Sequence, residues 1–153
     1  MLFLLFQLGE DRYAIEAAKI IAVLPLVIPK VIPHAPAAVS GVFDYRGTPM
    51  PLIDLSQLAL GRPARTHRST RIIVVHYPIN AGDDKSLGLI AEQAFETFER
   101  DPDDFVPSGV SGDGERYLGP VTSDARGLVQ WVRTEHLLPD EVRDLLFSDQ
   151  AAI

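Results

Sequence analysis

The sequence predicts a mainly β protein, built as a barrel or as a sandwich. Two observations support this fold class. Short apolar runs recur along the chain, and clusters of glycine, proline, asparagine and aspartate separate them. The two halves of the chain also echo each other, because each contains a glycine, a strand, an Arg-Gly turn and a second strand. The matching residues are Gly41, Arg46 and Gly47 in the first half and Gly119, Arg126 and Gly127 in the second.

The expected strands of the first half cover residues 2–8, 13–15, 23–28, 39–43 and 48–53. Ile15, Ala18 and Ile21 fall three residues apart, so residues 16–21 are expected to form one helical turn. Pro25 cannot donate a backbone hydrogen bond, and it therefore limits the strand at 23–28 to a sheet edge or a bulge.

Three connecting segments complete the first half. Four of the twelve prolines fall within residues 25–36, which predicts an ordered loop rather than a helix. Residues 55–60 are expected to form a short helix or turn that stops at Gly61, with the carboxylate of Asp54 as its cap. Residues 62–69 contain few apolar side chains, so we expect an exposed connector there.

The expected strands of the second half cover residues 71–77, 87–91, 95–98, 117–121 and 128–132. Residues 80–85 are expected to form a hairpin loop. Residues 101–115 contain five acids, three glycines and two prolines, which predicts a mobile loop. A C-terminal helix is expected to begin at Pro139. Its apolar face would consist of Val142, Leu145 and Leu146.

Composition places the chain among ordinary globular proteins. A chain of 153 residues predicts one domain with a substantial core, and 46% hydrophobic with 23% charged residues is typical of a soluble protein. The apolar run at residues 2–6 is too short to span a bilayer, and no basic segment precedes it as in a signal peptide. The absence of cysteine and of an export signal leads us to expect a cytoplasmic location.

Charge is divided unequally along the chain. Residues 1–71 carry 8 basic and 5 acidic side chains, a net charge of +3, whereas residues 72–153 carry 6 and 16, a net charge of −10. The acidic total of −7 argues against nucleic acid as a partner, because phosphate contacts need clustered cations. Either the unequal charge of the two halves orients a protein partner, or the acidic side chains simply keep loops solvated. The sequence leaves both interpretations open.

No residue pattern predicts catalysis, a cofactor or a metal site. The four histidines lie far apart in the sequence, and no thiol is present to complete a zinc site. Asp54 follows an apolar pair, as the catalytic aspartate of aspartic proteases does, but Leu55 and Ser56 replace the Thr-Gly of that motif. A small hydrolase that uses Asp54 as its catalytic acid therefore remains only an alternative.

Arg46 is the sharpest candidate for a binding residue. At a hairpin turn, an arginine is either a solvated surface residue or a planar five-donor group that binds backbone or carboxylate groups of a partner. The apolar residues near Pro25 allow two interpretations as well, since they belong either to the core or to an exposed groove. These residues are Val23, Leu24, Val27 and Ile28.

Residues 39–55, VSGVFDYRGTPMPLIDL, resemble the core of the CheW-like adaptor domain. In that domain an apolar run, a short polar-Leu-Arg-Gly turn and a Pro-apolar-apolar-Asp-Leu run follow one another. The resemblance covers nearly the whole chain. Its further segments are residues 6–9, 13–15, 87–92, 117–119 and 128–132.

The resemblance implies two small five-stranded β-barrels packed on a shared core, with short helices. The CheW-like domain would cover residues 1–138, and the C-terminal helix and tail residues 139–153. The first barrel would span about residues 14–70, and the second about residues 71–134 together with the N-terminal strand.

The resemblance also implies a function without chemistry of its own. Such an adaptor couples the cytoplasmic tip of a methyl-accepting receptor to the regulatory domain of a CheA-like histidine kinase, and it is recruited to membrane receptor arrays. We expect the receptor to contact Arg46, Asp44, Tyr45, Ile20 and Val23. We expect the kinase to contact Gly41, Val42 and Gly47.

Some residues depart from the usual family pattern. Asp44 and Tyr45 replace the usual Asn-Leu, Ala22 stands where an acidic residue is common, and Arg133 follows Val132 where Leu-Asp is frequent. Residues 24–26, 43–47 and 118–120 are more similar to adaptors of the Wsp type, which serve surface-sensing pathways that control cyclic-di-GMP synthesis. A generic peptide-binding β-module that adds a strand at a sheet edge is the remaining alternative.

Overall fold

The computed structural model describes residues 1–80, 83–109 and 116–147, without the side chains of 79–80 and 83–84. The strands are β1 (Leu2–Leu8), β2 (Asp11–Glu16), β3 (Ile20–Pro25), β4 (Val39–Tyr45), β5 (Thr48–Asp54), β6 (Arg71–Asn80), β7 (Asp83–Glu99), β8 (Leu118–Asp124) and β9 (Gly127–Val132). The α-helices are α1 (Leu55–Leu60) and α2 (Asp140–Phe147), and the single-turn 3-10 helices are η1 (Ala17–Lys19), η2 (Pro102–Asp104) and η3 (Thr134–His136).

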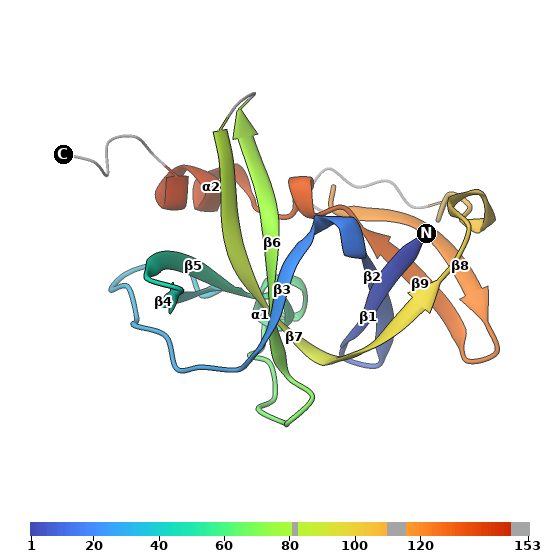
Figure 1. The fold of residues 1–153 in the computed structure, drawn as a ribbon, viewed down its shortest axis with the longest axis horizontal. Coiled ribbons are helices and arrows are strands. Elements are labelled where there is room, and N and C mark those ends of the chain that lie inside the picture. The colour runs from blue at the N-terminus through green and yellow to red at the C-terminus, as the bar shows by residue number, and fades with distance from the viewer. Residues whose placement is uncertain (81–82, 110–115, 148–153) are drawn as a thin grey trace.

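The strands form two five-stranded units that share β7. In the first unit the strand order is β3-β6-β7-β5-β4, and in the second it is β7-β1-β2-β9-β8. Figure 1 shows β7 leaving the half that contains β4 and β5 and entering the half that contains β1, β2, β8 and β9. The expected mainly β fold with two five-stranded units is therefore confirmed. Among the described strand pairs the sheets stay open and curved, so each unit is only barrel-like.

Strand β7 corrects two expectations. The segments expected at 87–91 and 95–98 are parts of one 17-residue strand, which bends near Gln93, where φ is +53°. The expected loop at 80–85 is wrong in its extent, because the β6–β7 ladder continues to Asn80 and Asp83. The sequence pattern does not predict a single strand here, because the two halves of β7 pair with different neighbours and bury different faces.

The expected boundary between residues 70 and 71 does not follow the strand pairing either. β6 and the first half of β7 pair with β3 and β5, so they belong to the first unit. β2 pairs with β1 and β9, so it belongs to the second unit rather than to a first unit that begins at residue 14. Long-range pairing, which a linear reading of the chain cannot supply, decides this division.

The largest core cluster is shared between the units, as expected. β6 shows how the strands divide their side chains, because Ile73 and Val75 point into this shared core while Ile72 and Val74 point into a separate core of the first unit. This alternation is the period of two that a strand imposes. A third cluster fills the second unit with Phe3, Leu5, Ala14, Phe105 and Val129.

The helical turn expected at residues 16–21 is shorter than predicted, because η1 ends at Lys19 and β3 occupies Ile20–Pro25 rather than the expected 23–28. The two α-helices match their predicted positions, with one correction to the buried face of α2. α1 ends at Gly61, which adopts φ of +73° as a left-handed cap, and α2 begins directly after Pro139. Val142 is buried and Leu146 packs against the shared core. Leu145 was expected on the same face, but its side chain is 48% exposed. The two leucines are adjacent, and a helix turns about 100° per residue, so only one of them can face the core.

Candidate functional site

The β4–β5 hairpin ends in a two-residue turn formed by Arg46 and Gly47, because Tyr45 and Thr48 are paired across the strands. Their φ angles are +52° and +86°, as a type I′ turn requires. The backbone N–H of Gly47 donates to Asp44 Oδ1 at 2.7 Å. The turn therefore holds Arg46 in a left-handed conformation that arginine rarely adopts.

The side chain of Arg46 is exposed at this turn. Its guanidinium carbon lies 5.6 Å from the centre of the Tyr45 ring, which is a cation–π distance. Tyr45 in turn is half-buried against the core of the first unit. No ion pair joins Arg46 to another residue in the part of the chain that the structure describes. The guanidinium is thus positioned by an aromatic support, while its donors face solvent.

The two apolar residues expected beside Arg46 lie elsewhere in the first unit. β3 and β4 form opposite edges of the five-stranded sheet, with β6, β7 and β5 between them. Ile20 is half-buried and packs against the shared core, whereas Val23 is 40% exposed. Ile20 pairs with Val75 and Val23 pairs with Ile73, and both partners point into the shared core, so the irregularity between Ile20 and Ala22 places Ile20 and Val23 on the same side of β3. Ile21, at this irregularity, is 39% exposed, and the sequence reasoning did not single it out.

Gly41 corrects a second expectation, because it is buried rather than part of an exposed surface. Its φ angle is +142°, and a Cβ atom there would lie 2.1 Å from the carbonyl oxygen of Lys30. Lys30 and Val42 exchange two backbone hydrogen bonds of 2.8 and 2.9 Å across this contact. The close backbone approach expected at Gly41 exists, but the approaching backbone belongs to the same chain.

The other two residues expected at the kinase contact lie along the same hairpin. Val42 is half-buried and uses its backbone to hold Lys30. Gly47 is exposed, and no atom lies within 4 Å of the position that a Cβ would occupy. Gly47 is therefore the accessible member of the three, and Gly41 and Val42 shape the surface from beneath.

Asp54 acts as the predicted helix cap. Its Oδ1 accepts hydrogen bonds from the backbone N–H groups of Ser56 and Gln57 at 3.0 and 3.3 Å. Its Oδ2 accepts from the N–H of Ala64 at 3.0 Å, which ties the connector after α1 to the end of β5. Both carboxylate oxygens are thus engaged in holding backbone, and the side chain is buried.

The β8–β9 hairpin carries the same Asp-x-Arg-Gly sequence but a different set of contacts. Asp124 accepts hydrogen bonds from the guanidinium of Arg12, and this contact lowers the pKa of Asp124 to about 2. The Asp124 hydrogen bond raises the pKa of Arg12 in return. Arg126 donates to both carboxylate oxygens of Glu96, at 3.0 and 3.1 Å. The sequence reasoning found the Arg-Gly echo but not these ion pairs, which join residues distant in the chain.

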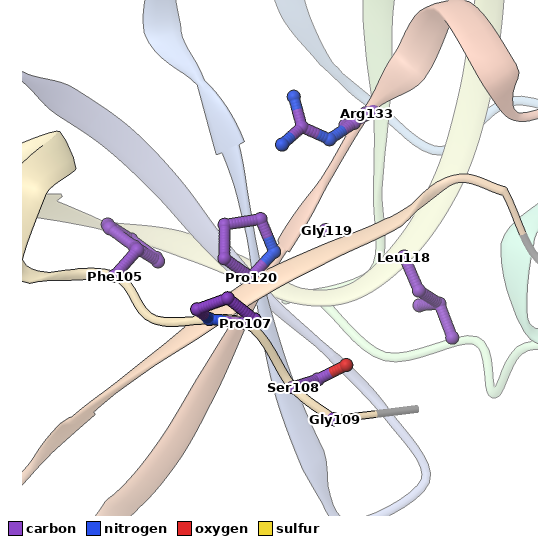
Figure 2. Close-up of a pocket in the computed structure, with 8 residues that line it drawn as sticks. All are labelled: Phe105, Pro107, Ser108, Gly109, Leu118, Gly119, Pro120 and Arg133. Carbon is purple, nitrogen blue, oxygen red and sulfur yellow. The ribbon is translucent and has the colours of Figure 1, made fainter. Parts of the chain in front are cut away.

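Each of the two units carries a hollow on its surface. One, of about 300 Å³, is lined in the first unit mainly by apolar residues: Leu26, Val27, Ile28, Pro29, Ala64 and Ile90. The other, of about 710 Å³, is open and lies in the second unit between residues 105–109 and β8 (Figure 2). Pro107 and Pro120 lie side by side there, next to the pair formed by Val106 and Val121. The guanidinium of Arg133 lies 5.7 Å from the Trp131 ring at its rim.

Comparison with protein families identifies this arrangement. A model described as the CheW-like domain matches residues 2–142. The chain belongs to the CheW-like family. This CheW-like chain is 28% identical over 118 residues to the chemotaxis protein CheW of Treponema pallidum (strain Nichols), covering 76% of the chain and 69% of that protein. It is 29% identical over 139 residues to the chemotaxis protein CheW of Helicobacter pylori (strain ATCC 700392 / 26695), covering 89% and 80%.

A solved structure supports the same fold. The crystal structure of the scaffolding protein TtCheW from Thermoanaerobacter tengcongensis matches with a TM-score of 0.79 at 20% identity, covering 92% of this CheW-like chain and 89% of that one. The adaptor role in chemosensory signalling that the sequence predicted is confirmed at the level of the family. None of the described helices has the length and apolar character needed to cross a membrane.

Proposed function

We propose that this CheW-like chain is a non-catalytic adaptor that couples a methyl-accepting receptor to a CheA-like histidine kinase. The observation that carries the proposal is the Arg46 turn, where a strained backbone holds a guanidinium outward on a Tyr45 support. Backbone strain of this kind costs stability and tends to be found at functional positions. An adaptor with two interfaces on one rigid body makes the receptor and kinase states thermodynamically linked.

On the receptor side, Arg46 donates hydrogen bonds to the polar edge of the helical receptor tip, next to Asp44 and Tyr45. The exposed side chain of Val23 offers an apolar contact on the β3 edge. Ile20 contributes less, since it is half-buried in the shared core. The curvature of the first unit brings both sheet edges around one core, in which Leu24 of β3 and Tyr45 of β4 both pack.

On the kinase side, the regulatory domain of the kinase contacts the exposed Gly47 and the neighbouring strand face at Val42. Gly41 supports this surface indirectly, because it allows the backbone at Lys30 to approach β4. Receptor binding recruits the adaptor, in the cytoplasm, to membrane receptor arrays.

The departures at Asp44 and Tyr45 favour a pathway of the Wsp type, in which the kinase output controls cyclic-di-GMP. Tyr45 places an aromatic ring beneath Arg46, which the leucine of the usual family motif lacks. Binding of this chain to purified receptor tips from a Wsp-type and from a flagellar pathway would decide between the two, and we expect tighter binding to the Wsp-type tip.

The test of the coupling proposal is a paired calorimetric titration of Arg46→Ala against the receptor tip and the kinase regulatory domain. Loss of a charge-assisted hydrogen bond costs about 1.5–3 kcal/mol, so receptor affinity should fall roughly ten- to a hundred-fold while kinase affinity stays near that of the wild type. Arg126→Ala is the matched control, since it removes the arginine of the other Asp-x-Arg-Gly turn. Equal loss of both affinities together with the melting temperature would show that Arg46 is structural.

Edge-strand addition at β3 is the alternative, because β3 is an edge strand and carries exposed apolar residues. A generic peptide-binding module of this kind predicts no effect of Arg46→Ala. It predicts instead that a proline substitution at Val23 abolishes binding by removing a backbone donor.

A further inference from the structure

The connector between α1 and β6, residues 61–70, carries an unbalanced positive charge. No acidic residue occurs from residue 55 to residue 82, whereas the connector contains Arg62, Arg65 and Arg68. All three arginines are exposed. Figure 1 shows the connector as the green loop beyond α1, well separated from the β4–β5 hairpin. This basic surface is therefore distinct from the surface proposed to bind the receptor.

The connector is held firmly, although it has no regular secondary structure. Ala94 donates a backbone hydrogen bond of 3.0 Å to Ser69 O, and Thr70 N donates one of 3.0 Å to His67 O. The buried hydroxyl of Thr70 also contacts the carbonyl oxygen of Arg65. Together with the Asp54–Ala64 bond, these contacts fix the backbone that presents the arginines. A fixed backbone reduces the entropy lost when a ligand binds.

A buried carboxylate orients one of these arginines. The side chain of Glu92 is only 8% exposed, and its Oε1 accepts a hydrogen bond from Arg65 Nε at 2.9 Å. This bond uses the Nε edge of the guanidinium, and no described residue forms an ion pair with its two terminal nitrogens. The side chain of Arg65 remains 68% exposed. Glu92 therefore fixes the direction of Arg65 and leaves the donors at its end for a ligand.

Arg65 lines a hollow on the surface, together with a second arginine, Arg62. This hollow has a volume of about 270 Å³, and its walls are Gly9, Glu10, Arg62, Pro63, Arg65 and Glu92. Arg62 Nη2 would lie 3.3 Å from a Cβ atom at Gly9, so the missing side chain there leaves room for the guanidinium. Glu10 adds one carboxylate at the rim, and the Glu92 carboxylate is engaged by Arg65. The hollow thus offers two guanidinium groups to an anion.

Alternate parts of the connector face two different hollows. Arg62, Pro63 and Arg65 line the polar hollow, whereas Ala64 and Thr66 line the apolar one. A peptide lying across the connector can place a carboxylate in the first and an apolar side chain in the second. The chemistry therefore fits a segment in which acidic and apolar residues alternate over short distances.

We propose that the hollow between Gly9 and the connector is a docking site for an acidic peptide segment of a third partner protein, whose carboxylate binds Arg62 and Arg65. The apolar hollow on the other side of Ala64 receives a neighbouring aliphatic side chain of the same segment. Guanidinium groups bind carboxylates through two parallel hydrogen bonds, which explains the choice of arginine. This site would let the adaptor hold a further component while the receptor and kinase surfaces remain occupied.

The test uses a short fluorescein-labelled peptide of repeating Glu-Glu-Leu units, titrated by fluorescence anisotropy against the full chain. A peptide of repeating Gln-Gln-Leu units is the matched ligand control. We expect saturable binding of the acidic peptide only, weakened on the order of tenfold by Arg62→Gln and again by Arg65→Gln. Arg116→Gln, which changes the net charge equally at an arginine that is 60% exposed in the segment before β8, should leave the affinity unchanged.

Each other outcome would overturn the proposal. Equal weakening by Arg116→Gln would mean that only net charge attracts the peptide. Equal affinity for the Gln-containing peptide would remove the carboxylate from the model, and binding of phosphatidylglycerol vesicles in place of the peptide would assign the arginines to a membrane surface. Arg65→Gln leaves the buried Glu92 without its arginine and can destabilise the fold. The affinity of Arg62→Gln for the acidic peptide is therefore the decisive measurement, because this substitution breaks no described ion pair. A parallel loss of kinase affinity in Arg62→Gln would make the connector part of the kinase interface instead.

Discussion

The β4–β5 and β8–β9 hairpins share the pattern Asp-x-Arg-Gly and use it in opposite ways. Asp44 and Gly47 frame the first turn, and Asp124 and Gly127 frame the second. In the second hairpin the aspartate binds Arg12 and the arginine binds Glu96, so both charges are engaged within the fold. In the first hairpin the aspartate binds the backbone of its own turn and forms no ion pair with a described residue, and Arg46 is exposed. A charge that the fold does not use is the better candidate for binding a partner.

The turns also differ in backbone conformation. In the first hairpin Gly47 lies inside the two-residue turn, whereas in the second Asp124 pairs with Gly127, so the glycine closes the turn. Arg46 therefore adopts a positive φ angle, while Arg126 does not. The strand register decides which residue of the motif occupies the left-handed position. The first hairpin pays for the orientation of its arginine with backbone strain.

The largest difference in the free energy of unfolding should be between variants of Gly41 and Gly119, the glycines that precede the two turns. Gly41→Ala combines a φ angle of +142° with a Cβ position 2.1 Å from Lys30 O, and we expect a loss of about 3 kcal/mol or more in the free energy of unfolding. At Gly119 the nearest atom, Trp131 O, is 2.9 Å away and φ is not positive, so Gly119→Ala should cost only about 1–2 kcal/mol. Urea unfolding of the two variants measures the difference. Equal losses would mean that the backbone contact at Lys30 relaxes easily.

The next largest difference in the free energy of unfolding should be between variants of Asp124 and of Asp44. Asp124→Asn removes a carboxylate that two arginine nitrogens bind and that is only 23% exposed, so we expect a loss of about 1–2 kcal/mol at neutral pH. Asp44→Asn keeps an oxygen that can accept from Gly47 N–H, and it should cost less than about 0.5 kcal/mol. Chemical denaturation at pH 7 tests this order. A larger loss for Asp44→Asn would contradict the assignment of the second hairpin as the charge-stabilised one.

The same pair predicts a pH dependence. The folded-state pKa of Asp124 is lowered to about 2 by the Arg12 hydrogen bond, so its stabilising contribution is present above the ordinary aspartate pKa near 4 and is lost as the pH falls toward 2. The wild-type chain should therefore lose more stability between about pH 4 and pH 2 than Asp124→Asn does. Parallel unfolding curves for the two proteins over this range would show that Asp124 is not the group responsible.

The smallest changes in the free energy of unfolding should come from substitutions of Arg126 and Arg46. Arg126→Asn breaks an exposed pair with Glu96 and should cost less than about 1 kcal/mol. Arg46→Asn places a residue that tolerates positive φ in the turn, so stability should stay constant or rise by a few tenths of a kcal/mol. Thermal unfolding compares the two. A clear loss of stability in Arg46→Asn would show that the cation–π contact with Tyr45 is worth more than the backbone strain costs.

Much of this protein is determined by local sequence. The alternation of apolar residues produces the strands, Asp54 and Gly61 set both ends of α1, and residues 39–55 carry enough of the family pattern to predict the fold and the adaptor role. These features depend on interactions between residues close in the chain, such as helix caps and turn conformations. The exposed position of Arg46 at a hairpin turn belongs to the same group.

The tertiary structure decided what depends on partners distant in the chain. It made β7 one strand shared by two sheets, buried Gly41 under the backbone of Lys30, and introduced a register irregularity in β3 that brings Ile20 and Val23 to the same face. It also gave one Asp-x-Arg-Gly turn two ion-pair partners, Arg12 and Glu96, and the other none among the described residues. Strand register and the curvature of the sheets bring such residues together, and neither quantity is encoded in a short stretch of sequence, because each results from the packing of the whole chain.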